Sequence, residues 1–320
     1  MENVQAAAEL AARIRAEIAK AVVGQREVVE MVLASLIAGG HVLLEGVPGV
    51  GKTLVARALA QAFGGSTNRV QFTPDLMPAD VVGHVFYDAA TGTMKLRKGP
   101  VFTHLLLADE INRAPAKTQA ALLEVMQERQ VTIEGESLPV PQPFMTLATQ
   151  NPIEMEGTYP LPEAQLDRFL MKVRIAYPSE AEEIDLTRHV TDQRVGDMLP
   201  LEAVRIVATP EDVISLQEMA ARLTVDGRVR EYAVRLVRAT REASGVAIGA
   251  GPRGAIALIR TARASALLDG RDFVLPDDVK SAAHAVLRHR IQLAPEAELE
   301  ARTADAVIDG VLEEVEAPRT

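Results

Sequence analysis

One octapeptide constrains this chain more than any other feature of its sequence. The segment Gly46–Thr53 reads GVPGVGKT and completes the pattern G-x-x-x-x-G-K-[ST]. Its glycines allow the backbone to turn tightly and to aim several N–H groups at one anion, because a side chain there would block the approach. Lys52 adds a positive charge for the β- and γ-phosphates, and Thr53 adds a hydroxyl for Mg²⁺. The pattern therefore predicts a loop that holds the phosphates of a nucleotide.

The residues on either side of this loop suit the same role. His41–Glu45 reads as a buried strand that runs straight into the loop, and Leu54–Phe63 reads as a helix that leaves it. The N-terminus of that helix would point its dipole at a bound phosphate. We expect the nucleotide contacts to comprise Gly46, Val47, Pro48, Gly49, Val50, Gly51, Lys52, Thr53 and Leu54.

The first half of the chain alternates apolar runs with helical patterns, as a parallel sheet with crossover helices does. Two predicted hairpins interrupt it, Val82–Arg97 with a turn at Asp88–Gly92, and Val131–Val140 with a turn at Gly135–Ser137. The predicted strands of the sheet are His41–Glu45, Arg69–Phe72, His104–Ala108, Phe144–Thr149 and Phe169–Ile175.

Beyond Pro178 the pattern becomes helical, and capping signals such as Thr209-Pro210 mark helix starts. We therefore predict an α/β core over residues 1–176, a connecting helical segment over 177–207, and a smaller all-α domain over 208–320. The predicted helices are Ser179–Thr191, Thr209–Leu223, Val229–Ala243, Pro252–Leu268 and Pro276–Leu287.

Composition narrows the possible partners. The formal net charge is −10, which argues against a general nucleic-acid or anionic-membrane binder, because phosphate contacts need clustered Lys and Arg. Cysteine is absent, and no apolar run approaches the roughly 20 residues that span a bilayer. The N-terminal stretch Met1–Lys20 has the pattern of an amphipathic helix and lacks the apolar centre of a signal peptide. We expect a cytoplasmic protein with no membrane span and no direct nucleic-acid partner.

Polar side chains follow two of the predicted strands at the point where each strand ends. Asp109 and Glu110 come directly after His104–Ala108, and Asn151 follows Phe144–Thr149. Because parallel strands end at one edge of a sheet, these side chains should lie beside the phosphate loop. There Asp109 would hold Mg²⁺ through its waters, Glu110 would orient an attacking water, and Asn151 would bridge that water and the γ-phosphate. This set favours hydrolysis over binding alone.

Two arginines stand near predicted element boundaries. Arg168 lies in the string Leu166–Phe169, just before the last strand, and Arg253 lies in Gly251–Gly254, at the start of a helix. Taken singly, each arginine is best explained as a salt-bridge residue. Phosphoryl transfer, however, gains from cations that reach the γ-phosphate, and a cation from a neighbouring subunit couples hydrolysis to assembly. With the other motifs, the two arginines fit that pattern.

The motifs, in their order and approximate spacing, resemble those of AAA+ ATPases. Three strings are similar to the MoxR family in particular, namely Asp109–Ala114 (DEINRA), Leu122–Met126 (LLEVM) and Gly157–Gln165 (GTYPLPEAQ). The likeness extends over nearly the whole chain, from about Ala21 to Ile291. The two predicted hairpins match the two inserts that distinguish one branch of AAA+ proteins.

The resemblance implies a ring-forming ATPase, usually a hexamer, that uses ATP and Mg²⁺. Such proteins remodel or activate client proteins, often with a partner that carries a von Willebrand A domain. The all-α domain would be the lid of the nucleotide site. Lys52 and Thr53 would be the phosphate-loop contacts, Asp109 and Glu110 the Mg²⁺ and water residues, and Asn151 the first sensor of the γ-phosphate.

The same resemblance implies roles for residues outside the phosphate loop. Arg168 would reach the nucleotide of a neighbouring subunit, and Arg253 would be a second sensor that reports the γ-phosphate to the lid. Gly24 and Gln25 would lie near the adenine. Arg113 is another candidate for reaching across a subunit interface, and the sequence leaves open whether it or Arg168 dominates.

Three alternative functions share some of these features. A GTPase-like switch is suggested by Asp80–Gly83, which matches D-x-x-G, but the chain contains no guanine-reading N-K-x-D motif. A DNA motor would need basic hairpin tips, whereas Asp88–Gly92 and Gly135–Ser137 are acidic or neutral. The nearest alternative is a magnesium-chelatase-type or carboxylase-activating AAA+ subunit, which would share the chemistry at the ATP site and differ only in its client.

Overall fold

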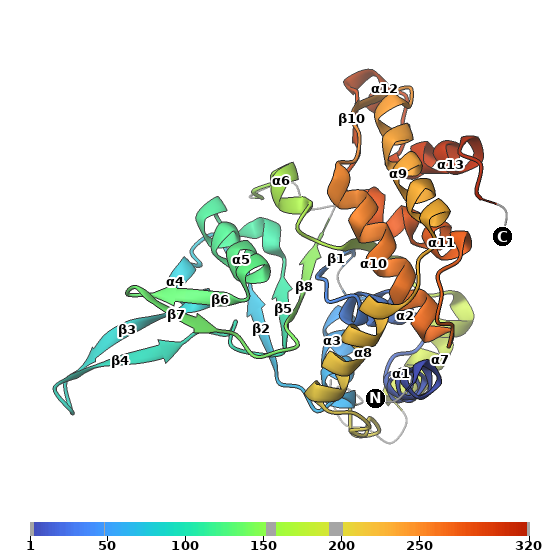
Figure 1. The fold of residues 1–320 in the computed structure, drawn as a ribbon. Coiled ribbons are helices and arrows are strands. Elements are labelled where there is room, and N and C mark those ends of the chain that lie inside the picture. The colour runs from blue at the N-terminus through green and yellow to red at the C-terminus, as the bar shows by residue number, and fades with distance from the viewer. Residues whose placement is uncertain (1–2, 48, 152–157, 192–200, 319–320) are drawn as a thin grey trace.

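The centre of the computed structural model is a five-stranded parallel sheet in the order β2-β5-β8-β1-β9 (Figure 1). Its strands are β1 (Val42–Gly46), β2 (Thr67–Gln71), β5 (Leu105–Asp109), β8 (Met145–Gln150) and β9 (Met171–Ile175). All five strands predicted for the sheet are confirmed. The structure describes residues 3–47, 49–151, 158–191 and 201–318.

Side chains on the strands alternate between two hydrophobic cores, one on each face of the sheet. On β5, Leu105 and Leu107 belong to one core, whereas Leu106 and Ala108 belong to the other. All four are at most 2% exposed. This burial on both faces accounts for the continuous apolar run LLLA, which is typical of a parallel strand covered on both sides.

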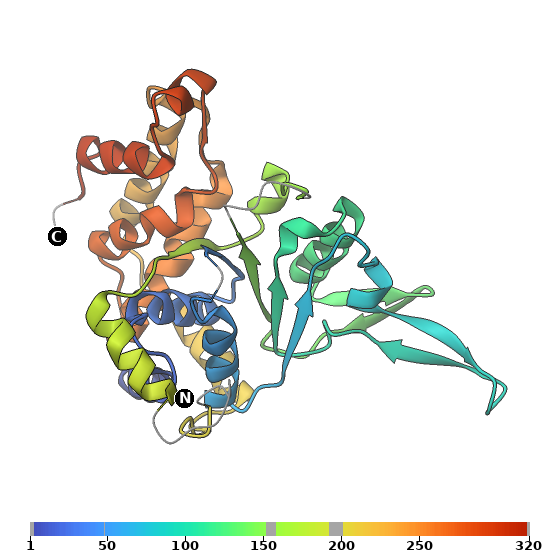
Figure 2. The same ribbon diagram turned by 180° about the vertical axis from the view of Figure 1, so that it is seen from behind.

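Helices form the two covering layers (Figure 2). Apolar side chains of α1 (Val4–Ala19), α2 (Arg26–Ile37) and α3 (Lys52–Ala62) fill the larger core. The smaller core on the opposite face is filled by the longer α5 (Ala116–Glu128) and the short α4 (Pro78–Val82). The sheet edge that carries the phosphate loop lies between these layers.

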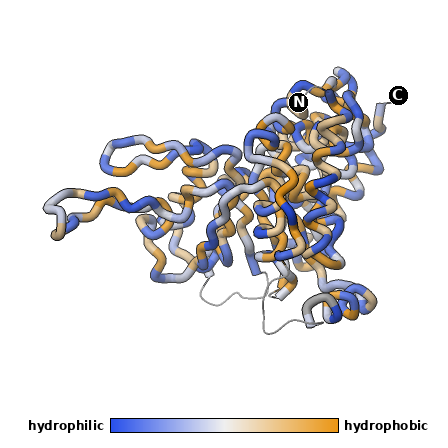
Figure 3. The backbone as a smooth tube through the Cα atoms, turned by 90° about the horizontal axis from the view of Figure 1, so that it is seen from below, coloured by the Kyte–Doolittle hydropathy of each residue, from blue (hydrophilic) through white to orange (hydrophobic). Residues whose placement is uncertain are grey.

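Two antiparallel hairpins leave this core, as the sequence predicts. They are formed by β3 (Gly83–Asp88) with β4 (Thr93–Lys98), and by β6 (Gln130–Ile133) with β7 (Glu136–Pro139). Both project away from the helices of the C-terminal half (Figures 1 and 3). Exposed Tyr87 and Met94 lie on the first hairpin.

The turn of the second hairpin differs from the prediction. Ile133 pairs directly with Glu136, so the turn consists of Glu134 and Gly135 instead of Gly135–Ser137. Both turn residues have positive φ, 49° and 83°. A two-residue turn of this kind matches the right-handed twist of the strands, which explains why the tighter connection forms.

The C-terminal half consists of helices that pack on one another and on the core. The longest, α10 (Pro252–Leu268), contacts α8, α9 and α11, and it also contacts α1 and α2 of the core. Antiparallel β10 (Val246–Ile248) and β11 (Gln292–Leu293) form a short ladder that the sequence pattern does not predict. The domain boundaries after residues 176 and 207 stay predictions. The other helices are α7 (Glu180–Thr191), α8 (Pro210–Arg222), α9 (Gly227–Glu242), α11 (Pro276–Leu287), α12 (Pro295–Leu299) and α13 (Ala304–Glu314).

The remaining helical elements are short: a 3₁₀ helix at Ile111–Arg113 and α6 at Glu163–Leu166. Within the described ranges, no helix is long and apolar enough to cross a membrane.

Buried His41 ties the start of β1 to the elements on both of its sides. Its Nε2 lies 2.9 Å from the carbonyl of Met126 at the end of α5, and its Nδ1 accepts a 3.0 Å hydrogen bond from the N–H of Thr146 on β8. Because Nδ1 accepts, the ring proton resides on Nε2, and the imidazole is neutral. Burial lowers the pKa of His41 from 6.5 to about 4.

We expect the free energy of unfolding to decrease as the pH is lowered from 6.5 to about 4. In this window the unfolded chain binds a proton at His41 that the folded protein excludes, so acid favours unfolding. His41 contributes a slope of at most about 1.4 kcal/mol per pH unit. Urea unfolding of the wild type and of His41→Asn at several pH values measures this slope. If the two slopes are equal, His41 does not titrate in this way.

Candidate functional site

The phosphate loop connects β1 to α3 and combines two kinds of glycine. Gly49 and Gly51 have φ of 84° and 81°, and a Cβ at either would meet no atom within 4 Å. These two are therefore required for backbone conformation, and the space beside them is open. Gly46 is required for packing, since a Cβ there would lie 2.7 Å from the carbonyl oxygen of Ile175 on β9. Pro48 lies outside the described residues.

Lys52 is the first residue of α3, and its side chain turns back toward the loop. Its Nζ donates a 2.5 Å hydrogen bond to the carbonyl of Gly46. Burial lowers the pKa of Lys52, while the nearby carboxylates of Asp109, Glu110 and Glu45 act to raise it. Lys52 is therefore a partly buried cation held inside the loop among acidic groups.

Asp109, the last residue of β5, is held from both neighbouring strands. Its Oδ1 accepts a 2.5 Å hydrogen bond from Thr149 Oγ1 on β8, and its Oδ2 accepts a 2.6 Å bond from Arg69 Nη2 on β2. The hydroxyl of Thr149 also accepts the N–H of Glu110 at 2.8 Å. These contacts fix the carboxylate at the edge of the sheet that carries the phosphate loop.

Glu110 follows in the left-handed conformation, with φ of 55°. Non-glycine residues rarely adopt it, so the surrounding contacts must stabilise this backbone. Its Oε2 accepts a 2.8 Å hydrogen bond from Gln71 Nε2 on β2 and lies 3.0 Å from Arg113 Nε. Of the two arginines considered for a subunit interface, Arg113 is thus paired with an acid of its own chain.

Asn151 follows β8 directly and is only 6% exposed. Because β8 lies between β5 and β1, its end falls between the acidic pair Asp109-Glu110 and the phosphate loop. The structure therefore places Lys52, Thr53, the acidic pair and Asn151 at one sheet edge.

A cavity of about 460 Å³ adjoins the loop on the side of the N-terminal segment. Gln25 lines it, and the Gln25 side-chain amide donates to the carbonyl of Val50 in the loop. Gly24 has φ of 72° and sits against α7, where a Cβ would lie 2.9 Å from Glu182 Cβ. The other lining residues are Val22, Val23, Gly49, Val50, Gly51, Leu54, Tyr177, Pro178, Glu183, Leu186 and Thr187.

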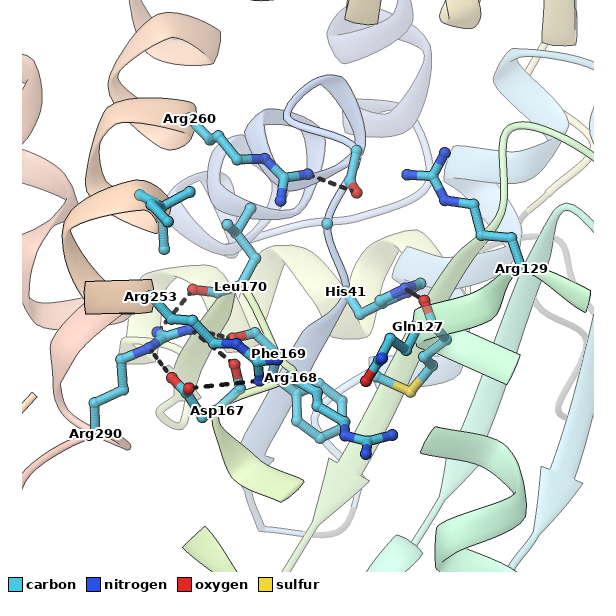
Figure 4. Close-up of a pocket in the computed structure, with 15 residues that line it drawn as sticks. His41, Gln127, Arg129, Asp167, Arg168, Phe169, Leu170, Arg253, Arg260 and Arg290 are labelled. Carbon is cyan, nitrogen blue, oxygen red and sulfur yellow. Dashed lines mark hydrogen bonds and ion pairs between the residues drawn. The ribbon is translucent and has the colours of Figure 1, made fainter. Parts of the chain in front are cut away.

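Arg168 and Arg253 lie together, but in a different cavity, which we call the arginine cavity (Figure 4). It measures about 350 Å³ and shares no lining residue with the cavity at the phosphate loop. Arg168 Nη1 donates a 2.8 Å hydrogen bond to the carbonyl of Leu123, and Arg253 Nη1 lies 3.6 Å from Asp167 Oδ2. Neither arginine lines the cavity at the phosphate loop of this chain. The arginines that line the cavity are Arg129, Arg168, Arg253, Arg260 and Arg290.

Three residues of the site have no counterpart among the sequence-based expectations: Arg69, Gln71 and Thr149. Gln71 pairs in register with Asp109, which brings Arg69 and Gln71 alongside the end of β5. The available signal was the presence of polar side chains two residues apart near the end of a predicted strand. Its meaning depends on β2 being the neighbour of β5, which the sequence does not specify.

Comparison with known proteins agrees with this geometry. Residues 41–171 match the ATPase family associated with various cellular activities (AAA), and residues 238–311 match the AAA lid domain. Chaperone MoxR1 of Mycobacterium tuberculosis is 47% identical over 95% of this chain and 81% of that protein. Protein MoxR of Methylorubrum extorquens is 35% identical over 97% and 96%. The crystal structure of a candidate ATPase from Cytophaga hutchinsonii matches with a TM-score of 0.91 and 41% identity, over 99% of this chain and 97% of that one.

The sheet order, the phosphate loop and the acidic strand end define a P-loop protein of the AAA+ class with a helical lid. Within this class, the chain belongs to the MoxR family of AAA+ ATPases. The predicted fold class, an α/β AAA+ core with two inserted hairpins followed by a smaller helical lid, is confirmed.

We expect replacement of Gln71 by Ala to lower the ATPase turnover about tenfold or more, because Glu110 would lose the hydrogen bond that orients its carboxylate. ATP affinity should stay within about twofold of the wild type, since the side chain of Gln71 bonds Arg69 and Glu110. Steady-state kinetics and fluorescent-nucleotide titration measure the two quantities. Asn68→Ala on the same strand is the matched control, because that amide donates to the carbonyl of Pro100 instead. Equal turnover in both variants would contradict a positioning role for Gln71.

Proposed function

We propose that this protein hydrolyses ATP in a Mg²⁺-dependent reaction, as a subunit of a ring, and uses the energy to remodel or activate client proteins. The observation that supports hydrolysis most strongly is the convergence of Lys52, Asp109 and Glu110 at the carboxyl edge of one sheet. A protein that only bound nucleotide would not need a fixed carboxylate beside the acid suited to the metal.

Each residue of this group has a distinct task. The N–H groups of the loop and the ammonium of Lys52 would hold the β- and γ-phosphates. Thr53 and Asp109 provide the oxygen ligands that Mg²⁺ prefers, and the bound ion would neutralise charge on the phosphates. Glu110 would polarise the attacking water, and Asn151 would hold that water in line with the γ-phosphate.

The two arginines Arg168 and Arg253 support a site shared between subunits. Both line a cavity separate from the phosphate loop of their own chain. In a closed ring, one face of each subunit meets a different face of its neighbour. We infer that the arginine cavity meets the triphosphate of the adjacent subunit, with Arg168 as the trans arginine and Arg253 as the second sensor. A homo-hexamer is the ring size we propose.

The chaperone-like role and the kind of partner are proposed from kinship alone. MoxR1 of Mycobacterium tuberculosis is named a chaperone, and we propose a chaperone-like role for this chain, with a von Willebrand A domain protein as its partner. A cytoplasmic location completes the proposal. Because Glu110→Gln should hold ATP without turnover, affinity capture on this variant, read by mass spectrometry, is the direct way to identify the client.

Two substitutions separate nucleotide binding from hydrolysis. Lys52→Ala should abolish measurable ATP binding, because the partly buried charge that would hold the phosphates is lost. Glu110→Gln should bind ATP with nearly unchanged affinity but lose turnover by about 100-fold or more, because the amide cannot act as a base. Fluorescent-nucleotide titration and phosphate release measure the two effects. Equal loss of binding in both variants, or a clear preference of the wild type for GTP, would refute the assigned roles.

Mixed rings test whether each site is shared. Arg168→Ala alone should hydrolyse ATP poorly, and so should Glu110→Gln alone. When the two are mixed, sites with an intact Glu110 will face neighbours with an intact Arg168, and turnover should exceed the mean of the two variants severalfold. Titration of one variant into the other measures the recovery. If every mixing ratio gives only the weighted mean, Arg168 does not act in trans.

A further inference from the structure

Arg290, just beyond α11 of the lid, is a deeply buried arginine among those that line the arginine cavity. Its side chain is 3% exposed, and its Nε forms a 2.7 Å ion pair with Asp167 Oδ1. The guanidinium also donates to the backbone carbonyls of Asp167, Phe169 and Leu170, at 3.3, 2.7 and 3.2 Å. Figure 4 shows these contacts converging on the segment 167–170 from the lid.

The hydrogen bonds of Arg290 go to residues on both sides of Arg168 in the chain. Arg290 contacts the residue before Arg168 and the two residues after it. The Arg168 side chain instead points toward α5, where it donates to the carbonyl of Leu123. Arg290 therefore fixes the backbone on both sides of Arg168. The position of the Arg168 guanidinium depends in turn on that backbone.

The guanidinium of Arg290 also bonds residues of the lid itself. Its Nη1 donates to the carbonyl of Val286 in the last turn of α11 and lies 2.8 Å from His289 Nε2. His289 Nε2 in turn lies 3.1 Å from the carbonyl of Phe169. The end of α11 and the segment 167–170 are thus joined by one planar group with several donors, a role that a single ammonium cannot reproduce.

Such a buried charge needs a reason, because burying a cation is unfavourable unless its partners compensate for lost water. Burial lowers the pKa of Arg290 even though the carboxylate of Asp167 acts to raise it. Asp167 itself is shared, since its other oxygen lies 3.6 Å from Arg253 Nη1. One carboxylate therefore connects Arg290 with Arg253, and it belongs to the residue directly before Arg168.

We propose that Arg290 is a positioning residue for Arg168, through which the helical lid sets the arginine that acts on the nucleotide of the adjacent subunit. The inference rests on the proposed function of Arg168. It makes lid and arginine one mechanical unit, so that a displacement of the lid changes how well its subunit promotes hydrolysis next door.

The test uses the full-length chain with Arg290→Met and Arg290→Lys. A displacement of about 1 Å at a catalytic group can reduce a rate about 100-fold, so we expect turnover to fall between about tenfold and 100-fold in Arg290→Met, with a smaller loss in Arg290→Lys. The KM for ATP should stay within about twofold, because the variant's own phosphate loop is intact. Mixing either variant with Glu110→Gln subunits should raise turnover above the mean of the two.

Arg288→Met is the matched control. Arg288 is a partly buried arginine two residues earlier, and it also bonds the core, but its partners are the carbonyl of Lys172 and the carboxylate of Asp305. This variant should keep its turnover within about twofold, and its mixtures with Glu110→Gln should give the weighted mean. Thermal unfolding and ring size, measured by light scattering, are recorded for every variant.

The outcomes separate this inference from the proposed function. If Arg168→Ala recovers in mixtures and folded Arg290 variants do not, the trans site stands and the positioning role is wrong. If neither recovers, the trans assignment of Arg168 is itself refuted. If Arg290→Met and Arg290→Lys both fail to fold or assemble while Arg288→Met succeeds, Arg290 is a folding determinant and the inference is overturned.

Discussion

Hydrogen bonding between parallel strands is the constraint on which the rest of the structure depends. It fixes which strands are neighbours and at what level they end, with Ala108 opposite Ala148 and Glu45 opposite Gln150. Residues far apart in the sequence, such as Lys52 and Glu110, therefore meet at one edge. Burial of both sheet faces makes this register rigid, because slippage would move apolar side chains between two closely packed cores.

Much of the fold and of the phosphate loop could be predicted from the sequence, and the same physical reasons explain which parts could not. Strands buried on both faces are apolar throughout, and a phosphate loop has few permitted sequences, so β1, β5 and Gly46–Thr53 were recognisable. The roles of Arg69 and Gln71 were not, because they depend on β2 lying beside β5. The strands β10 and β11 are too short to show an alternation of apolar and polar residues. The turn of the second hairpin is shorter than predicted, because a two-residue turn fits the twist of the strands better.

The arginine cavity concentrates positive charge at a surface that we assign to a contact between subunits. The described residues that line it include five arginines and a single carboxylate, Asp167. Burial lowers the pKa of Arg260, and the charge of Arg129 lowers it further, which reflects repulsion between like charges. An anion placed there would relieve this repulsion for residues of the core and of the lid alike. The cavity is therefore a place where one ligand could hold two parts of the protein together.

Arg129 connects the second hairpin to the arginine cavity. Arg129 ends α5 in the left-handed conformation, and its carbonyl accepts the N–H of Val140, so it closes the base of the β6–β7 hairpin while lining the arginine cavity. A two-stranded ribbon anchored at one end behaves as a lever arm, in which a small rotation at the pivot becomes a larger displacement at the tip. The Glu134-Gly135 turn lies at the tip of this hairpin, so a rotation at Arg129 would displace it more than any other part of the hairpin.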